Sequence, residues 1–156
     1  MSIEKVKEYL KKFDYTNKII ELTQSSATVE LAALALGCEG KQIAKTMSFD
    51  VNGNTILVLL AGDVKVDNAK YKQTFGVKAK MLGFDEVENR VGHKVGGVCP
   101  FGVNEGIKIY LDVSLKRFDI VYPAAGNANS AVKLTIPELE TCSGFESWVD
   151  VSKFVE

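Results

Sequence analysis

The dipeptide Asn52-Gly53 separates two segments that both have the character of β-strands. Residues 45–49 before it alternate between polar and apolar side chains, and residues 55–61 after it form an almost unbroken apolar run. Asn-Gly readily adopts the backbone conformation of a two-residue hairpin turn, and alternation with period two is typical of strands. The sequence therefore predicts a β-hairpin whose second strand lies in the middle of a sheet.

Helical patterns occur on both sides of this hairpin. Apolar side chains at positions 3, 6, 10 and 13 share one helical face, and lysines and glutamates occupy the others. Residues 29–36 are nearly all alanine and leucine, which predicts a buried helix that ends at Gly37. Further helices are expected over residues 66–75, 84–91 and 137–140, and strands over 19–22, 77–81, 107–111, 118–122 and 131–135.

The order of these elements indicates an α+β fold in one domain, residues 1–156. Helices and strands are mixed, with strands clustered late, and no repeat, linker or low-complexity segment divides the chain. A chain of 156 residues, 46% hydrophobic and 25% charged, is long enough to bury a core without metals or disulfides.

Charge and cysteine usage exclude several classes of protein. The formal net charge of −1 argues against a protein that coats nucleic acid through bulk charge, although it leaves room for a local basic groove. One histidine and three scattered cysteines (Cys38, Cys99, Cys142) give no zinc-ligand spacing, so we expect no metal. With no signal peptide, no membrane span and no paired cysteines, the expected location is the cytoplasm and no membrane partner is expected.

The segment HKVGGVCPFG, residues 93–102, supports two chemical interpretations. Cys99 and His93 could form a nucleophile and its base, but in the simpler alternative Cys99 is packed and His93 is exposed. Gly96 and Gly97 could let backbone N–H groups approach a ligand, or could form only a tight turn. Pro100 fixes the path by which the chain leaves the loop.

Two further features qualify as parts of a site. Lys45 stands where a short helical segment passes into a strand, and its ammonium group could bind phosphate or a carbonyl oxygen, or be merely solvated. Small residues fill the loop 124–130, which could form a pocket floor or a mobile connector. The glycine motifs that cradle nucleotide phosphates do not occur.

Four stretches in this order, TVELAALALGCEGKQIAKTMSF, VGGVCPFG, DVSLKRFDIVYPAAGN and AVKLTIPEL, resemble the YbaK/EbsC family. This family is related to the editing insertion domain of bacterial prolyl-tRNA synthetase, and the resemblance covers about residues 19–148. It implies a mixed, barrel-like sheet flanked by helices. It also implies hydrolysis of the ester between an amino acid and the 3′-terminal adenosine of a mischarged tRNA, without a cofactor.

The resemblance also assigns residues. The family's lysine falls on Lys45, followed by Thr46, and its glycine-proline loop falls on Gly96, Gly97 and Pro100. Its second glycine-containing loop falls on Gly126, Asn127 and Asn129. The implied catalytic set is Lys45, Gly96 and Gly97, and the implied substrate-binding set is Thr46, Pro100, Gly126, Asn127 and Asn129.

Two departures from the family patterns affect the substrate. The synthetase insertion domain has a histidine in the second loop, where this chain has Asn127 and Asn129, and the cysteine-specific branch has an aspartate near Ala131. The resulting prediction is a trans-editing deacylase that removes a small amino acid, from tRNA-Pro, with a synthetase as a further partner. The alternative is a non-catalytic module on the same fold that binds aminoacyl-tRNA, a nucleotide or a protein; a Cys99-dependent hydrolase is a third.

Overall fold

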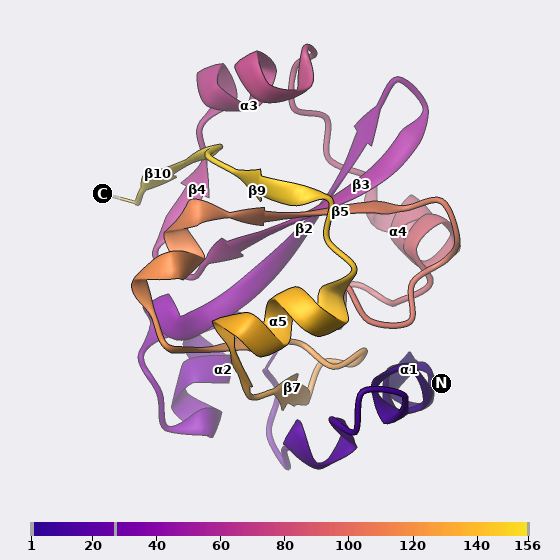
Figure 1. Ribbon diagram of the computed structural model, residues 1–156, viewed down its shortest axis with the longest axis vertical. Helices are drawn as coiled ribbons and strands as arrows, with labels where there is room; N and C mark the ends of the chain where they lie inside the picture. The colour runs from indigo at the N-terminus through magenta and orange to yellow at the C-terminus, as the bar shows by residue number, and fades with distance from the viewer. Residues whose placement is uncertain (1, 27, 156) are drawn as a thin grey trace.

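The fold is organised around β3 (Asn54–Ala61), the second strand of a long hairpin and a central strand of the sheet. The computed structural model describes residues 2–26 and 28–155 (Figure 1). β3 pairs antiparallel with β2 (Ile43–Val51) along residues 44–51 and 54–61. Asn52 and Gly53 have φ angles of 52° and 88°, as a hairpin turn of this kind requires. Residues 56–61 are all buried, so the predicted hairpin and its central strand are both confirmed.

Four further strands complete a curled, mixed sheet in the order β8-β6-β2-β3-β5-β9. β5 (Lys108–Asp112) runs parallel to β3, and β9 (Ser147–Val149) runs parallel to β5. On the other side, β6 (Ile120–Pro123) runs parallel to β2 and β8 (Leu134–Thr135) antiparallel to β6. The expected single domain with a mixed, barrel-like sheet is confirmed.

Two small ribbons lie at the margins of this sheet. β1 (Ile19–Glu21) pairs antiparallel with β7 (Ser130–Val132), and β4 (Val64–Val66) pairs antiparallel with β10 (Ser152–Phe154). Each ribbon therefore joins segments that are far apart in the sequence.

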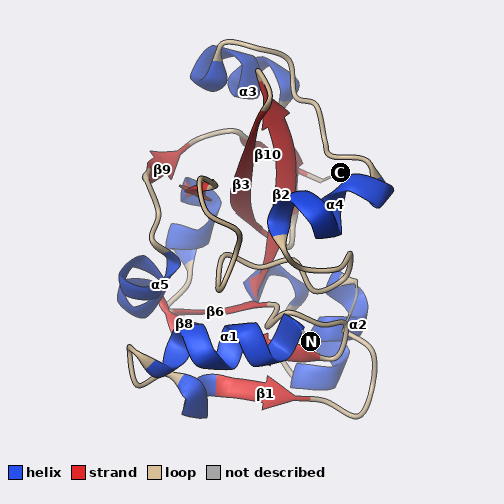
Figure 2. Cartoon of the chain, turned by 90° about the vertical axis from the view of Figure 1, so that its right-hand side faces the viewer, coloured by secondary structure: helices blue, strands red, loops and turns tan. Residues whose placement is uncertain are grey.

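The helices surround the sheet rather than form a separate layer, as Figures 1 and 2 show. Three of the helices begin at a side-chain cap: Thr28, Asp67 and Thr135 accept hydrogen bonds from backbone N–H groups in the first turns that follow them. The helices are α1 (Ser2–Lys11), α2 (Val29–Leu36), α3 (Asn68–Phe75), α4 (Phe84–Val91) and α5 (Ile136–Ser143).

Two expectations about these elements are wrong. Helix α2 is not buried: Ala32 is its one buried residue, and Leu34 is 77% exposed. Apart from Glu30 the helix is apolar all round, so its sequence does not show which face is buried, and here a single narrow face is covered. Residues 77–81 form no strand, because their pairing with β2 is limited to an isolated bridge between Met81 and Phe49.

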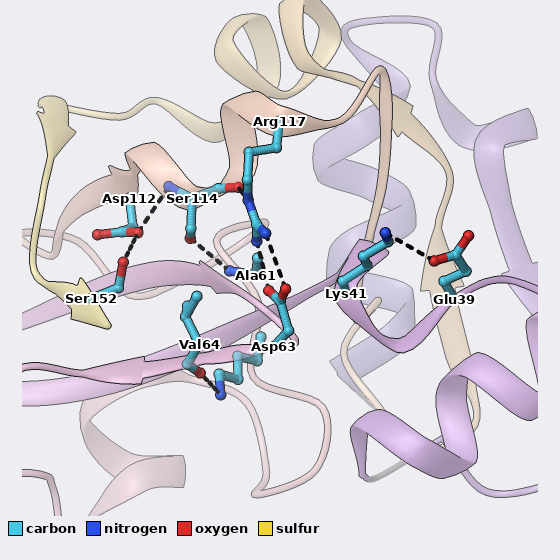
Figure 3. Close-up of polar contacts among 10 residues, drawn as sticks. Glu39, Lys41, Ala61, Asp63, Val64, Asp112, Ser114, Arg117 and Ser152 are labelled. Carbon is cyan, nitrogen blue, oxygen red and sulfur yellow. Dashed lines mark hydrogen bonds and ion pairs between the residues drawn. The ribbon is translucent and has the colours of Figure 1, made fainter. Parts of the chain in front are cut away.

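A buried carboxylate attaches the C-terminal segment to the sheet. Asp112, at the end of β5, is fully buried and accepts hydrogen bonds from Ser114 N (3.0 Å), Val151 N (2.8 Å) and Ser152 Oγ (2.6 Å). Figure 3 shows Asp112 between Ser114 and Ser152. Burying a carboxylate away from water costs free energy unless it is hydrogen-bonded, and these three donors offset that cost.

We predict that Asp112→Ala lowers the free energy of unfolding by about 3 kcal/mol or more, because it leaves several buried donors without an acceptor. Urea denaturation measures this change. The control is Asp119→Ala, at an exposed aspartate, for which we expect a change within about 0.5 kcal/mol. Equal stability of the two variants would contradict a structural role for Asp112.

Candidate active site

A cavity of about 380 Å³ opens beside β2, between helices α2 and α4. Its wall includes the β2 residues from Ile43 to Ser48, Gly96 in the first glycine loop, and Ala124 and Ala131 on either side of the second. A volume of this size lies in the range of small-molecule sites. The cavity is therefore the place where the two glycine-rich loops and the predicted lysine meet.

Lys45 is the cationic residue in the cavity wall. Its side chain is partly buried, and its ammonium group donates a hydrogen bond to the carbonyl oxygen of Val64. Burial lowers the pKa of Lys45, while the carboxylates of Asp63 and Glu30 act in the opposite direction. An ammonium group has three donors, so Lys45 can bond to Val64 and still bind an oxygen atom of a ligand.

The turn between β3 and β4 fixes the position of Val64, whose carbonyl oxygen accepts the hydrogen bond from Lys45. Asp63 receives a bidentate pair from Arg117, with Nη2 and Nη1 at 2.6 and 3.0 Å from its two oxygens. Ala61 N donates to Ser114 Oγ at 3.1 Å. Gly62 lies so close to Gly40 that a Cβ atom there would overlap with the Gly40 backbone. These contacts, most of them visible in Figure 3, fix the position of Val64 relative to β2.

The two glycine-rich loops pack directly on each other. A Cβ atom built at Gly97 would lie 2.6 Å from Asn127 Cα, and even closer to other backbone atoms of Gly126 and Asn127. The N–H group of Gly97 donates to Lys94 O at 3.0 Å, so it closes a turn within its own loop. Gly96, with a φ of 93°, is the member of the pair that lines the cavity.

The asparagine side chains of the second loop form hydrogen bonds with other residues of the protein. Asn127 Oδ1 accepts from Asn129 N (3.2 Å) and from Ser130 Oγ (2.6 Å), and Asn129 Nδ2 donates to Leu22 O (3.0 Å). These bonds connect the loop to the segment after β1 and set the position of Ser130 and Ala131 in the cavity wall.

The predicted site residues thus divide into two groups. Lys45, Thr46 and Gly96 line the cavity, and the Thr46 hydroxyl is a buried oxygen with no hydrogen-bond partner in the described part of the chain. The residues outside the cavity wall are Gly97, Pro100, Gly126, Asn127 and Asn129. Sequence reasoning did not identify Ser26, Thr28 and Ser48 as wall residues, because their only sequence signal was a helix cap or a strand position.

Cys99 and His93 lie in the core behind the first loop. Burial raises the pKa of the Cys99 thiol to about 12, and neither residue has exposed surface. The expectation that His93 is exposed is therefore wrong. His93 Nε2 lies 2.6 Å from Phe101 O, so Nε2 carries the proton, and burial lowers the pKa of the ring. A protonated thiol without access to the cavity is unsuited to nucleophilic attack.

No group of three or more His, Cys, Asp or Glu side chains within residues 2–26 and 28–155 is placed to hold a metal ion. No helix in that same part of the chain is long and apolar enough to cross a membrane.

Comparison with known proteins gives a consistent set of relatives. The sequence profile of the aminoacyl-tRNA editing domain matches residues 23–142. An uncharacterised protein of Bacillus subtilis, YwhH, is 47% identical over 154 residues, which is 98% of both chains. A proline–tRNA ligase of Bacillus cytotoxicus is 29% identical over 104 residues, 65% of this chain but 18% of the ligase.

A solved structure of similar shape adds to these relatives. It is that of a candidate trans-editing enzyme for prolyl-tRNA synthetase, with a TM-score of 0.88 and 29% sequence identity. The similarity covers 97% of each chain.

We predict that Gly97→Ala separates the two loops and lowers the free energy of unfolding by about 2 kcal/mol, because its methyl group would overlap with backbone atoms that cannot rotate away. Thermal or urea denaturation measures the loss. Gly40→Ala is the matched control, since its Cβ would make only an ordinary contact with Val29 at 3.4 Å. A Gly97→Ala variant as stable as the Gly40→Ala variant would exclude this close packing.

We also predict that the native protein exposes one reactive thiol. Cys38 is partly exposed, whereas Cys99 and Cys142 are buried, with thiol pKa values raised to about 12. A colorimetric thiol reagent should therefore titrate one equivalent in the folded protein and three in denaturant. Rapid reaction of three equivalents in the folded state would contradict the burial of Cys99 and Cys142.

Proposed function

The chain belongs to the aminoacyl-tRNA editing domain family, and from this we propose that it hydrolyses the ester that joins a small amino acid to the 3′-terminal adenosine of a mischarged tRNA. The observation that carries the proposal is the meeting of Lys45, Thr46 and Gly96 in one cavity. A proton donor, a hydroxyl group and an exposed backbone segment are the groups that ester hydrolysis uses.

The reaction needs stabilisation of negative charge rather than a protein nucleophile. Water attacks the carbonyl carbon, the bond to the ribose oxygen breaks, and the proton released by the water ends on that ribose oxygen. Charge accumulates on the carbonyl oxygen in the transition state, where fixed donors in a partly dry site are most effective. Lys45 is assigned to this oxygen or to the terminal phosphate, and the backbone at Gly96 to the same oxygen.

The neighbouring hydroxyl group of the substrate's own ribose is assigned to orient the attacking water. This assignment leaves Cys99 and His93 without a chemical role, in agreement with their burial behind the loop. No metal or cofactor enters the proposed reaction.

Selectivity is assigned to the volume and lining of the cavity. The wall includes Ala32, Ala44, Ala124 and Ala131 together with the hydroxyl groups of several serine and threonine residues, and we assign selection for a small side chain to this mixed lining. A synthetase separates side chains that differ by one methylene group by only about 1–3 kcal/mol, and a second, smaller site adds to that discrimination.

We assign tRNA-Pro as the carrier, acting in the cytoplasm in trans and beside prolyl-tRNA synthetase. The supports are the local similarity to proline–tRNA ligase and the overall similarity to a candidate trans-editing enzyme for that synthetase. The remaining site residues, Gly97, Pro100, Gly126, Asn127 and Asn129, are proposed to shape the two loops that receive the acceptor end.

A binding module without catalysis is the second candidate function. It is favoured by one contact, the hydrogen bond that already occupies the Lys45 ammonium group with Val64 O. If the Lys45 ammonium group donates only to Val64 O and not also to a substrate oxygen, the cavity could hold an aminoacyl-adenosine without hydrolysing it.

Deacylation of a panel of mischarged tRNAs tests the proposal. The panel contains alanine, cysteine and serine on tRNA-Pro and serine on tRNA-Thr. We predict hydrolysis of at least one ester on tRNA-Pro and a loss of about 100-fold or more for Lys45→Ala, since an oriented charged donor is removed. Lys65→Ala is the matched control, at an exposed lysine next to Val64, and should retain the activity.

Cys99→Ala completes the panel and should keep the rate if it folds, which denaturation verifies. Absence of hydrolysis with every ester would exclude the deacylase and favour the binding module. Loss of activity in Cys99→Ala together with full activity in Lys45→Ala would instead restore the Cys99-dependent hydrolase.

A further inference from the structure

Three large apolar side chains stand exposed around the mouth of the cavity. Phe84 is 82% exposed, Met81 57% and Val95 47%, and all three also contribute to the cavity wall. We refer to these three residues as the rim. Single exposed apolar residues are common, but an exposed aromatic ring grouped with two other apolar side chains at a cavity mouth is typical of a binding surface.

The rim is held by backbone contacts to the sheet. Leu82 N donates to Ser48 O (3.1 Å) and Asp50 N donates to Lys80 O (2.8 Å), so the segment that carries Met81 is fastened to β2. Phe84 is the first residue of α4, which Figure 2 shows beside β2. The segment that carries Met81 is thus held on the sheet before a ligand binds, which reduces the cost of ordering this part of the rim.

We propose that the rim binds the adenine base of the 3′-terminal nucleotide, with the ring of Phe84 as the stacking partner. This inference rests on the proposed function, because it takes the aminoacyl ester as the group that enters the cavity. The base and the ester are attached to the same ribose, so a base whose ester lies in the cavity must lie at its mouth. Every nucleobase has a π-face that stacks on an exposed aromatic ring.

The charges near the rim favour a base, rather than a phosphate, against Phe84. Asp85 and Glu86 follow Phe84 in the first turn of α4 and are exposed carboxylates; Glu86 is paired with Arg90 at 3.4 Å, and Asp85 repels phosphate there. The exposed Lys80 and Lys94 directly precede Met81 and Val95 in the chain. These two lysines supply positive charge for the nucleic-acid backbone next to Met81 and Val95, and the uncharged base is assigned to the ring of Phe84.

The test is a double comparison of binding with uncharged acceptor-stem RNA hairpins. One hairpin ends in CCA, and the other has an abasic terminal nucleotide in place of the adenosine. Fluorescence anisotropy gives the Kd of each with the wild-type protein and with Phe84→Ala. Neither hairpin carries an amino acid, so neither has an ester that the protein could hydrolyse. The measured Kd values are therefore independent of catalysis.

For the wild-type protein we expect the CCA hairpin to bind about 5- to 100-fold more tightly than the abasic one. Phe84→Ala should remove this preference, and Phe84→Trp should keep it. Phe154→Ala is the matched control, at a phenylalanine that is 62% exposed but contacts Arg117 rather than the cavity.

An undiminished preference in Phe84→Ala, or no preference in the wild-type protein, would overturn the assignment of the rim. Failure of the deacylation panel with a Phe84-dependent adenine preference would remove the proposed reaction and leave the rim assignment intact. Hydrolysis by the wild-type protein, together with an adenine preference that Phe84→Ala does not change, would support the proposed reaction and remove the rim assignment.

Discussion

The burial of β3 on both of its faces is the constraint on which the rest of the molecule depends. Residues 56–61 have almost no exposed surface, so elements must cover both sides of this strand. β2 and β5 pair with its two edges in the curled sheet, and buried side chains of the hydrophobic core cover its faces. β2 carries Lys45 into the cavity wall, and β5 carries the buried Asp112 that fastens the C-terminal segment. The core and the candidate site are therefore consequences of the same strand.

Two adjacent glycines of the first loop have different roles in the structure. Gly96 lines the cavity, where an exposed backbone can face a ligand, while Gly97 allows the loop to touch Gly126 and Asn127. The close packing of the two backbones holds the loops together just outside the cavity wall, to which the same loops contribute Gly96 and Ala124. Cys99 and His93, the most reactive residue types in this segment, lie on the core side and contribute packing instead.

Local patterns predicted the elements that depend on local chemistry. The structure has the Asn52-Gly53 turn, the apolar β3 and the helices that end at Gly37 and after residue 90. Each of these could be predicted because its signal lies in residues that are close together in the sequence. The burial of His93, the pairing of β4 with β10 and the exposure of α2 depend on contacts between distant segments. Lys45 was singled out through the family resemblance, because position alone does not distinguish one lysine from another. The rim had no sequence signal, since an exposed Phe84 and a buried one look alike in a helical pattern.

The surroundings of Lys45 show how a cation can be buried without being neutralised. Asp63 lies near enough to raise the pKa of Lys45, yet both oxygens of Asp63 are bound by Arg117. The ammonium group is bonded to the Val64 carbonyl, a neutral acceptor. A direct ion pair with a carboxylate would compete strongly with a substrate oxygen, since hydrogen bonds between charged partners are the strong ones. By holding Asp63, Arg117 leaves Lys45 with its charge directed at whatever enters the cavity, and this keeps a partly buried lysine suited to binding an ester or a phosphate.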